Sequence, residues 1–187
     1  MGLRSTSSRY GTVAQAFHWL TVVLVLAAYV LSKGDPYSLY SAAADGTRRI
    51  HEMLGMLVLT VIVLRLLWRL IDGAPATEPI QGWMAAAAKL VQLTLYALLV
   101  AIPATAVLGT WLEGLPLTFP GFDIAPQIPQ VHGLGQLIVE IHSTLVNVIL
   151  WVAGVHVAGA LFHHFYLRDG VLKSMAPGGR TPRLRKD

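Results

Sequence analysis

The sequence predicts an all-α protein, a bundle of four helices that each cross a membrane. Hydrophobic residues make up 55% of the 187 residues, charged residues make up 13%, and the mean hydropathy is +0.59. Soluble domains carry about 25% charged residues, so this composition favours an integral membrane protein. The hydrophobic residues gather in four segments, and each is long enough at the rise of an α-helix to span about 30 Å of hydrocarbon.

The four segments differ in the charges they carry. The first covers residues 12–32 and has no formal charge, and the second covers residues 51–70 and carries Arg65 and Arg69 towards its end. The third, residues 85–111, has Lys89 near its start and Pro103, which is expected to kink the helix. The fourth lies within residues 140–169, which contain no Asp, Glu, Lys or Arg between His142 and Tyr166.

The basic residues indicate how the four segments are oriented. An even number of spans places both termini on one side, and that side holds all of the fourteen Lys and Arg except Lys33, Arg48 and Arg49. By the positive-inside rule, both termini are expected in the cytoplasm of a bacterium, with the chain in the inner membrane. The opposite face is called the outer face below.

Residues 1–175 are expected to form one membrane domain, and residues 176–187 a basic tail lying disordered on anionic headgroups. At the outer face, residues 33–50 are expected to form a polar loop. Residues 112–136 contain four prolines and should form a stiff, partly non-helical lid over the bundle. His132 falls in this lid, as polar surface or as cover for a site beneath it.

Four histidines fall into two pairs at matched depth. His142 and His156 are fourteen residues apart, so one helix places them on nearly the same face about 21 Å apart. His51 opens the second segment at the outer face, level with His142. His18 lies about two turns into the first segment from the inner side, level with His156. Ionisable residues inside a membrane span are energetically costly, because the hydrocarbon contains no water to hydrogen-bond them. Such residues are therefore taken to indicate a functional site.

Two imidazoles from different helices at one depth are the axial ligands that a b-type haem needs. We therefore predict two bis-histidine haems, one held by His51 and His142 (the outer pair) and one by His18 and His156 (the inner pair). With both axial positions filled, such a centre carries electrons and does not bind dioxygen. The chain has no Cys, which excludes disulfides, Cys-ligated iron–sulfur clusters and covalent haem attachment.

Small residues accompany the histidines. Gly55 follows His51 by one turn, and Gly154 and Gly159 flank His156. Glycine beside a ligand leaves room for a flat porphyrin, although small residues are also common where membrane helices pack together.

Further residues are candidates for cofactor or substrate contacts. His163, two turns beyond His156, is expected either to contact a quinone or an inner-haem propionate, or to be a plain interfacial residue. Lys89 lies at a comparable depth and is a second candidate for the quinone site. Arg48 and Arg49 precede the outer pair, where they could bind a haem propionate, attract a small anion or be surface charge.

The motifs resemble those of the bacterial cytochrome b561 family. They are AFHW at 16–19, RIHEMLG at 49–55, VLRLLWRL at 63–70, EIHSTLVN at 140–147 and GVHVAGALFHHFYLRD at 154–169. The resemblance implies a four-helix membrane cytochrome with two b haems, whose ligands match the four paired histidines. One branch of the family is similar to a superoxide oxidase, which takes electrons from superoxide at the periplasmic face and reduces ubiquinone.

Three functions follow from these observations. The first is the enzyme that the resemblance implies, a superoxide:ubiquinone oxidoreductase. The second is a non-catalytic subunit that carries electrons between a periplasmic redox partner and the quinone pool. The third, a transporter that uses the histidines to bind zinc or nickel, is disfavoured because the spans lack the carboxylates that would compensate a moving cation. Membrane lipid is an expected partner in each case and nucleic acid in none.

Overall fold

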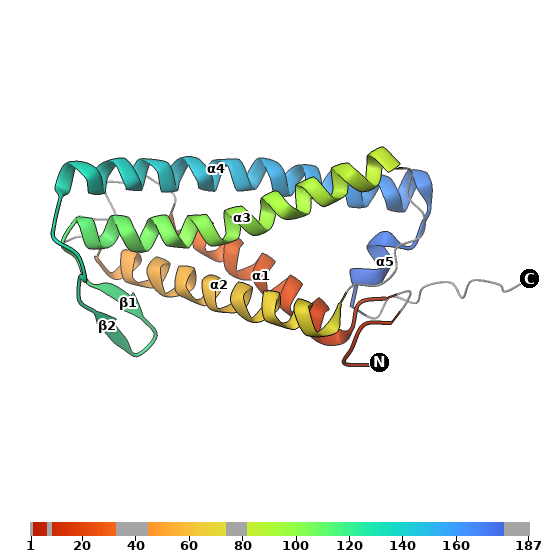
Figure 1. Cartoon of the computed structure of the whole chain (residues 1–187), viewed down its shortest axis with the longest axis horizontal. Helices are drawn as coiled ribbons and strands as arrows, with labels where there is room; N and C mark the ends of the chain where they lie inside the picture. Colours follow the sequence, from red (N-terminus) through yellow and green to blue (C-terminus); the bar gives the residue numbers. More distant parts are fainter. Residues whose placement is uncertain (1, 7–8, 33–44, 74–81, 178–187) are drawn as a thin grey trace, which may run out of the picture.

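Four long helices lie side by side in a computed structural model, which describes residues 2–6, 9–32, 45–73 and 82–177 (Figure 1). They are α1 (Thr12–Leu31), α2 (Asp45–Asp72), α3 (Gly82–Leu112) and α4 (His132–Phe162). All four are long and apolar enough to cross a membrane. The prediction of an all-α bundle with four spans is therefore confirmed.

The apolar side chains are distributed as expected of helices surrounded by lipid. Trp151 is 80% exposed and Leu70 is 83% exposed, and many other large hydrophobic side chains also point outward. A soluble protein rarely exposes so much contiguous apolar surface. Inside a bilayer each helix satisfies its own backbone hydrogen bonds, which is why apolar segments of this length form helices there.

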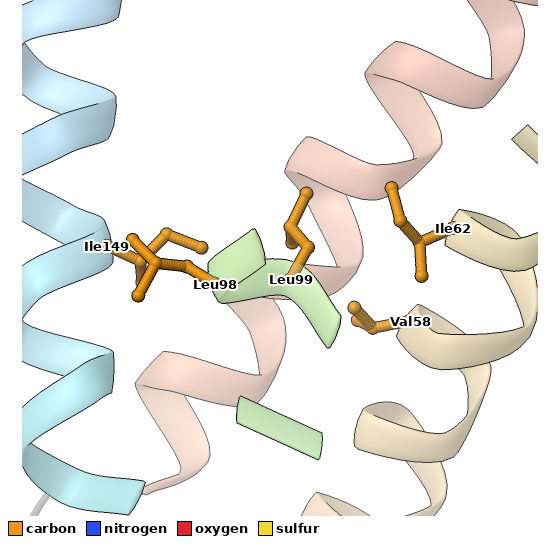
Figure 2. Close-up of a cluster of buried hydrophobic side chains, with 5 residues drawn as sticks. All are labelled: Val58, Ile62, Leu98, Leu99 and Ile149. Atoms are coloured by element: carbon orange, nitrogen blue, oxygen red, sulfur yellow. The ribbon is translucent and has the colours of Figure 1, made fainter. Parts of the chain in front are cut away.

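The interior of the bundle is small and lies at mid-depth. Helix α1 packs along α2, α3 packs along α4, and α2 also contacts α3. Figure 2 shows Leu98 of α3 beside Ile149 of α4, and Leu99 of α3 towards Val58 of α2. Ile149 lies seven residues after His142 and seven before His156, so this core cluster separates the levels of the outer and inner pairs.

Two helices begin earlier than the sequence predicts. Helix α2 starts at Asp45, so Arg48 and Arg49 lie on the helix and not in a loop. Helix α4 starts at His132, within the stretch 112–136 that was expected to be a loop, so the placing of His132 in the lid is wrong. The last proline of that stretch is Pro129, and nothing after it prevents helix formation. The described residues leave out residues 33–44 of the polar loop predicted over residues 33–50. They also leave out residues 178–187 of the tail predicted over residues 176–187.

The proline-rich stretch contains a short antiparallel hairpin, β1 (Leu117–Phe119) paired with β2 (Phe122–Ile124). Gly121 has φ 92°, a backbone conformation that glycine adopts without steric cost at a tight turn. Strand β1 packs against α2 and α3, and the hairpin marks one end of the bundle, called the hairpin end (Figure 1). The stretch therefore lies against one end of the bundle, and the expected lid over the outer face stays a prediction.

Both ends of the described chain meet at the opposite end of the bundle, called the terminal end (Figure 1). Helix α4 continues into a π-helical turn, η3 (His163–Leu167), and then the short helix α5 (Val171–Met175). The segment before α1 binds α5: Tyr10 N donates to Ser174 O at 3.3 Å, and Gln15 Nε2 donates to the same oxygen at 3.0 Å. Trp19 Nε1 donates to Met175 O at 3.1 Å.

Ile62 tests whether the mid-depth core holds the bundle together. It is fully buried, whereas Ile71 on the same helix is 64% exposed. Replacing a core isoleucine by alanine removes dispersion contacts and leaves a cavity, which costs roughly 2–5 kcal/mol in packed cores. We expect Ile62→Ala to lower the unfolding temperature in detergent by several degrees and Ile71→Ala to change it little, as followed by circular dichroism. Equal shifts for the two variants would contradict this account of the core.

Candidate functional site

The outer pair lies between α2 and α4 near the hairpin end. The ring centres of His51 and His142 are 6.3 Å apart and the ring planes are inclined by 84°. His51 Nδ1 lies 3.0 Å from Ala28 O of α1, and His142 Nδ1 lies 2.9 Å from Ile102 O of α3. A carbonyl only accepts, so both Nδ1 atoms carry the proton, and each Nε2 keeps the lone pair that binds a metal.

The inner pair has the same ring spacing and lies between α1 and α4. The ring centres of His18 and His156 are also 6.3 Å apart, with the planes inclined by 62°. Its surroundings differ from those of the outer pair, because His18 Nδ1 lies 3.3 Å from Nη2 of Arg65 on α2. The structure thus brings together, two by two, the same four histidines that the sequence paired by depth.

The spacing of the rings is that of two ligands on opposite sides of one metal ion. A metal–imidazole bond of about 2.0 Å, with about 1.2 Å from that nitrogen to the ring centre, separates two such ring centres by roughly 6.4 Å. The described residues contain no group of three or more His, Cys, Asp or Glu placed to hold a metal ion. Structural and catalytic zinc sites use three or four protein ligands, whereas each of these pairs supplies two.

An open cleft lies at the outer pair, with about 770 Å³ of empty space when the solvent at its mouth is included. His51, His142 and Gly55 line it, and the core cluster residues Val58, Leu99 and Ile149 also lie along it. A Cβ added at Gly55 would have no heavy atom within 4 Å, and the same holds at Gly154 and Gly159 beside the inner pair. Apolar walls, two facing imidazoles and glycines that open onto free space fit a flat hydrophobic macrocycle such as the porphyrin of a haem.

The two arginines near the outer pair are both engaged with acidic residues. Arg48 is buried, and its Nη1 lies 2.6 Å from Oε1 of buried Glu52. Arg49 is partly exposed and pairs with Asp123 of β2 at 2.9 and 3.1 Å. Sequence reasoning missed Glu52, although its place one turn after Arg48 is a signal for an ion pair.

Glu52 also connects α2 to the hairpin. Its second oxygen, Oε2, accepts a hydrogen bond from the backbone N of Thr118 in β1 at 3.0 Å, and both Glu52 and Leu117 line the cleft. The hairpin is therefore fastened to α2 at two points, one buried at Glu52 and one exposed at Arg49. Leu117 places the hairpin directly against the outer site.

At the terminal end, His163 is held by a carboxylate. Its Nδ1 lies 2.5 Å from Oδ2 of Asp169, whose Oδ1 accepts from the backbone N of Val171 at 3.0 Å. Arg168, between them, has the left-handed φ of 54° that turns the chain back towards the helix. The contact with Asp169 could not be predicted from the sequence, because it depends on the π-helical turn.

Two other candidates from the sequence have different surroundings. Lys89 is exposed on α3, and no hydrogen bond or ion pair joins it to His163 in the described part of the chain. His132 lies at the start of α4 and its Nδ1 is 2.6 Å from Oε2 of Glu113. These positions place neither residue at the paired histidines.

The profile of the family described as "Prokaryotic cytochrome b561" matches residues 9–178, which is most of the chain. The chain belongs to the prokaryotic cytochrome b561 family. It is 30% identical over 178 residues to "Cytochrome b561 homolog 2" of Escherichia coli strain K12, covering 94% of this chain and 95% of that protein. It is 26% identical over 176 residues to the "Probable superoxide oxidase CybB" of Yersinia pestis, covering 92% of this chain and 98% of that protein.

Membership establishes the general character of this cytochrome b561. It is a bacterial membrane protein of an electron-transfer family whose members bind b-type haem. The resemblance read from the histidine motifs is confirmed at this level.

Proposed function

We propose that this cytochrome b561 holds two b haems, one at each histidine pair, and moves electrons across the bacterial inner membrane from superoxide to ubiquinone. The observation that carries the proposal is the repeated 6.3 Å separation of paired rings at two levels of the bundle. A bis-histidine haem supplies reversible one-electron chemistry without an open coordination position. The protein's part is to hold, orient and shield that group at each level.

The proposed roles at the outer site follow from the fixed geometry of its ligands. His51 and His142 each donate from Nδ1 to a carbonyl of a neighbouring helix, which sets the tautomer and leaves the lone pair of Nε2 to bind a metal. Gly55 leaves space along the face of the ring system. Arg48, buried beside Glu52, is suited to hold a propionate, whereas Arg49 is exposed enough to act on an anion arriving from water.

Superoxide is proposed as the donor on two grounds. One relative of similar length carries the printed name of a probable superoxide oxidase. The second is that an electron donor can act at the exposed edge of a haem without binding iron, and cationic side chains near that edge attract a small anion. The proposed orientation places both termini in the cytoplasm and the outer pair at the periplasmic face.

Ubiquinone is the proposed acceptor at the terminal end. Reducing a quinone to a quinol takes two electrons and two protons, and histidine is the side chain best suited to move protons near neutrality. The carboxylate of Asp169 accepts a hydrogen bond from Nδ1 of His163 and so holds the ring with Nε2 directed away from Asp169. We propose that Nε2, protonated in the imidazolium form, donates a hydrogen bond to a quinone carbonyl and then supplies that proton, with Lys89 as a candidate partner.

Haem content tests the pairing directly. Purified protein should contain about two haems per chain, released by acid acetone because no Cys tethers them. His51→Ala and His142→Ala should remove one spectral component, and His18→Ala and His156→Ala the other, because each variant removes one axial ligand. A pyridine haemochrome assay measures the content and redox spectra measure the components.

A variant of the cleft provides a matched control for this test. Gly55→Leu should displace only the outer haem, since the new side chain enters the cleft. Gly46→Leu, on the same helix and also without a neighbouring atom within 4 Å, should retain both. One haem per wild-type chain, or loss of the same component from His51→Ala and His18→Ala, would refute the two sites.

The charges at Arg49 test the superoxide step. Arg49→Gln removes a cation near the outer site and should slow haem reduction by superoxide a few-fold, with a flatter dependence on salt. Asp123→Asn removes the opposing charge and should accelerate the reduction. Stopped-flow mixing with the oxidised protein measures both rates. If superoxide reduces the wild-type haems no faster than it reduces a heat-denatured sample, a protein donor becomes the better explanation.

Variants at the terminal end test the quinone step. His163→Ala and Asp169→Asn should keep both haems and normal reduction from outside, yet slow the reduction of a soluble ubiquinone analogue. The reason is that one variant removes the group that contacts the carbonyl and the other removes the group that orients it. His164→Ala is the matched control from the adjacent position. Quinone reduction at the wild-type rate in His163→Ala would place the site elsewhere.

A further inference from the structure

Arg65 lies at the level of the inner pair. It follows His51 on α2 by fourteen residues, the same interval that separates His142 from His156 on α4. Fourteen residues are close to four helical turns, so Arg65 faces nearly the same way as His51 but at the inner level. Its Nη2 lies 3.3 Å from Nδ1 of His18, and its guanidinium carbon lies 5.4 Å from the ring centre of Tyr96.

The charge of Arg65 has no counter-ion among the described residues. The other two arginines near a histidine pair differ, since Arg48 pairs with Glu52 and Arg49 with Asp123. Arg65 is only partly exposed, and it lies about two turns before the end of a helix that is long and apolar enough to span a membrane. A cation in such a position is costly unless an anion or a strong acceptor accompanies it.

The contact between Arg65 and His18 does not supply that acceptor once His18 binds a metal. An imidazole that ligates through Nε2 carries its proton on Nδ1, as the carbonyl contacts of His51 and His142 illustrate. A guanidinium has five N–H donors and no acceptor. In the metal-binding tautomer, His18 Nδ1 and Arg65 Nη2 are both donors, so the guanidinium must turn to another group.

We infer that Arg65 belongs to the inner haem site, where it binds a haem propionate and raises the reduction potential of that haem. The inference rests on the proposed function in one respect, that His18 and His156 hold a haem. A propionate is a carboxylate, and guanidinium binds carboxylates through two parallel hydrogen bonds. The ring of Tyr96 stabilises the guanidinium by a cation–π contact at the same time.

The effect on potential follows from charge. Reduction adds one negative charge to the haem, and a fixed cation close to it in a medium of low dielectric constant favours the reduced form. Arg65 lies directly at the inner pair, with its Nη2 3.3 Å from Nδ1 of His18. Among the described residues, the outer pair has no comparable uncompensated cation, because Arg48 and Arg49 are each paired with a carboxylate.

Potentiometric titration of the purified haem protein tests this inference. Arg65→Gln keeps a hydrogen-bond donor but removes the charge, and Arg65→Lys keeps the charge but not the paired donors. We expect Arg65→Gln to lower the reduction equilibrium constant of the inner haem about tenfold, which is a 59 mV decrease for one electron, and to leave the outer haem unchanged. Arg65→Lys should show a smaller decrease.

Arg69→Gln is the matched control, one turn further along the same helix. Arg69 contacts Tyr10, with Nη1 3.4 Å from the phenol oxygen, and makes no hydrogen bond to the four paired histidines in the described structure. It should therefore leave both potentials unchanged. An equal decrease of the inner haem's potential in Arg69→Gln would overturn the inference, because the decrease would then follow from the lower net positive charge of the terminal end and not from a contact of Arg65.

Haem content decides the remaining outcomes. Loss of only the inner haem from Arg65→Gln supports the inference, since propionate binding is then required for retention. Two haems with unchanged potentials in Arg65→Gln would overturn it, and so would loss of both haems from both Arg65 variants, which would indicate a general folding role. If His18→Ala retained the inner spectral component, the proposed function itself would fail, whatever Arg65 does.

Discussion

The hydrogen bonds from the outer histidines to backbone carbonyls determine much of this structure. His51 of α2 binds α1 through Ala28 O, and His142 of α4 binds α3 through Ile102 O. These two bonds connect the four helices in pairs and fix the tautomer of each ring. Ile102 directly precedes Pro103, the proline inside α3 that is expected to kink the helix, so the expected kink lies beside the carbonyl that His142 contacts.

The two histidine pairs share one spacing but have different electrostatic surroundings. At the hairpin end each arginine is opposed by a carboxylate, and Glu52 joins that charge pair to the backbone of β1. At the inner level, Arg65 has an imidazole and an aromatic ring as its described neighbours. One bundle thus provides two histidine pairs of similar geometry with different charges beside them. Two identical haems bound at these pairs would differ in reduction potential for that reason.

The sequence predicted the features that depend on helix length and helix period. Apolar segments longer than a bilayer is thick predict spans, and the fourteen-residue interval between His142 and His156 predicts two levels. Features that depend on contacts between distant residues escaped prediction. Glu52 reaches Thr118 across 66 residues of sequence, and Asp169 reaches His163 only because a π-helical turn and a left-handed Arg168 bring it back.

The contact between the two ends of the chain has a consequence for biosynthesis. The segment from Tyr10 to Trp19 binds the backbone of Ser174 and Met175, more than 150 residues away. Neither these bonds nor either histidine pair can form until α4 has left the ribosome and entered the bilayer, because α4 supplies one ring to each pair. The first three helices must therefore wait in the membrane as an incomplete bundle. A haem held between two histidines, as proposed above, would be bound only after translation has passed α4.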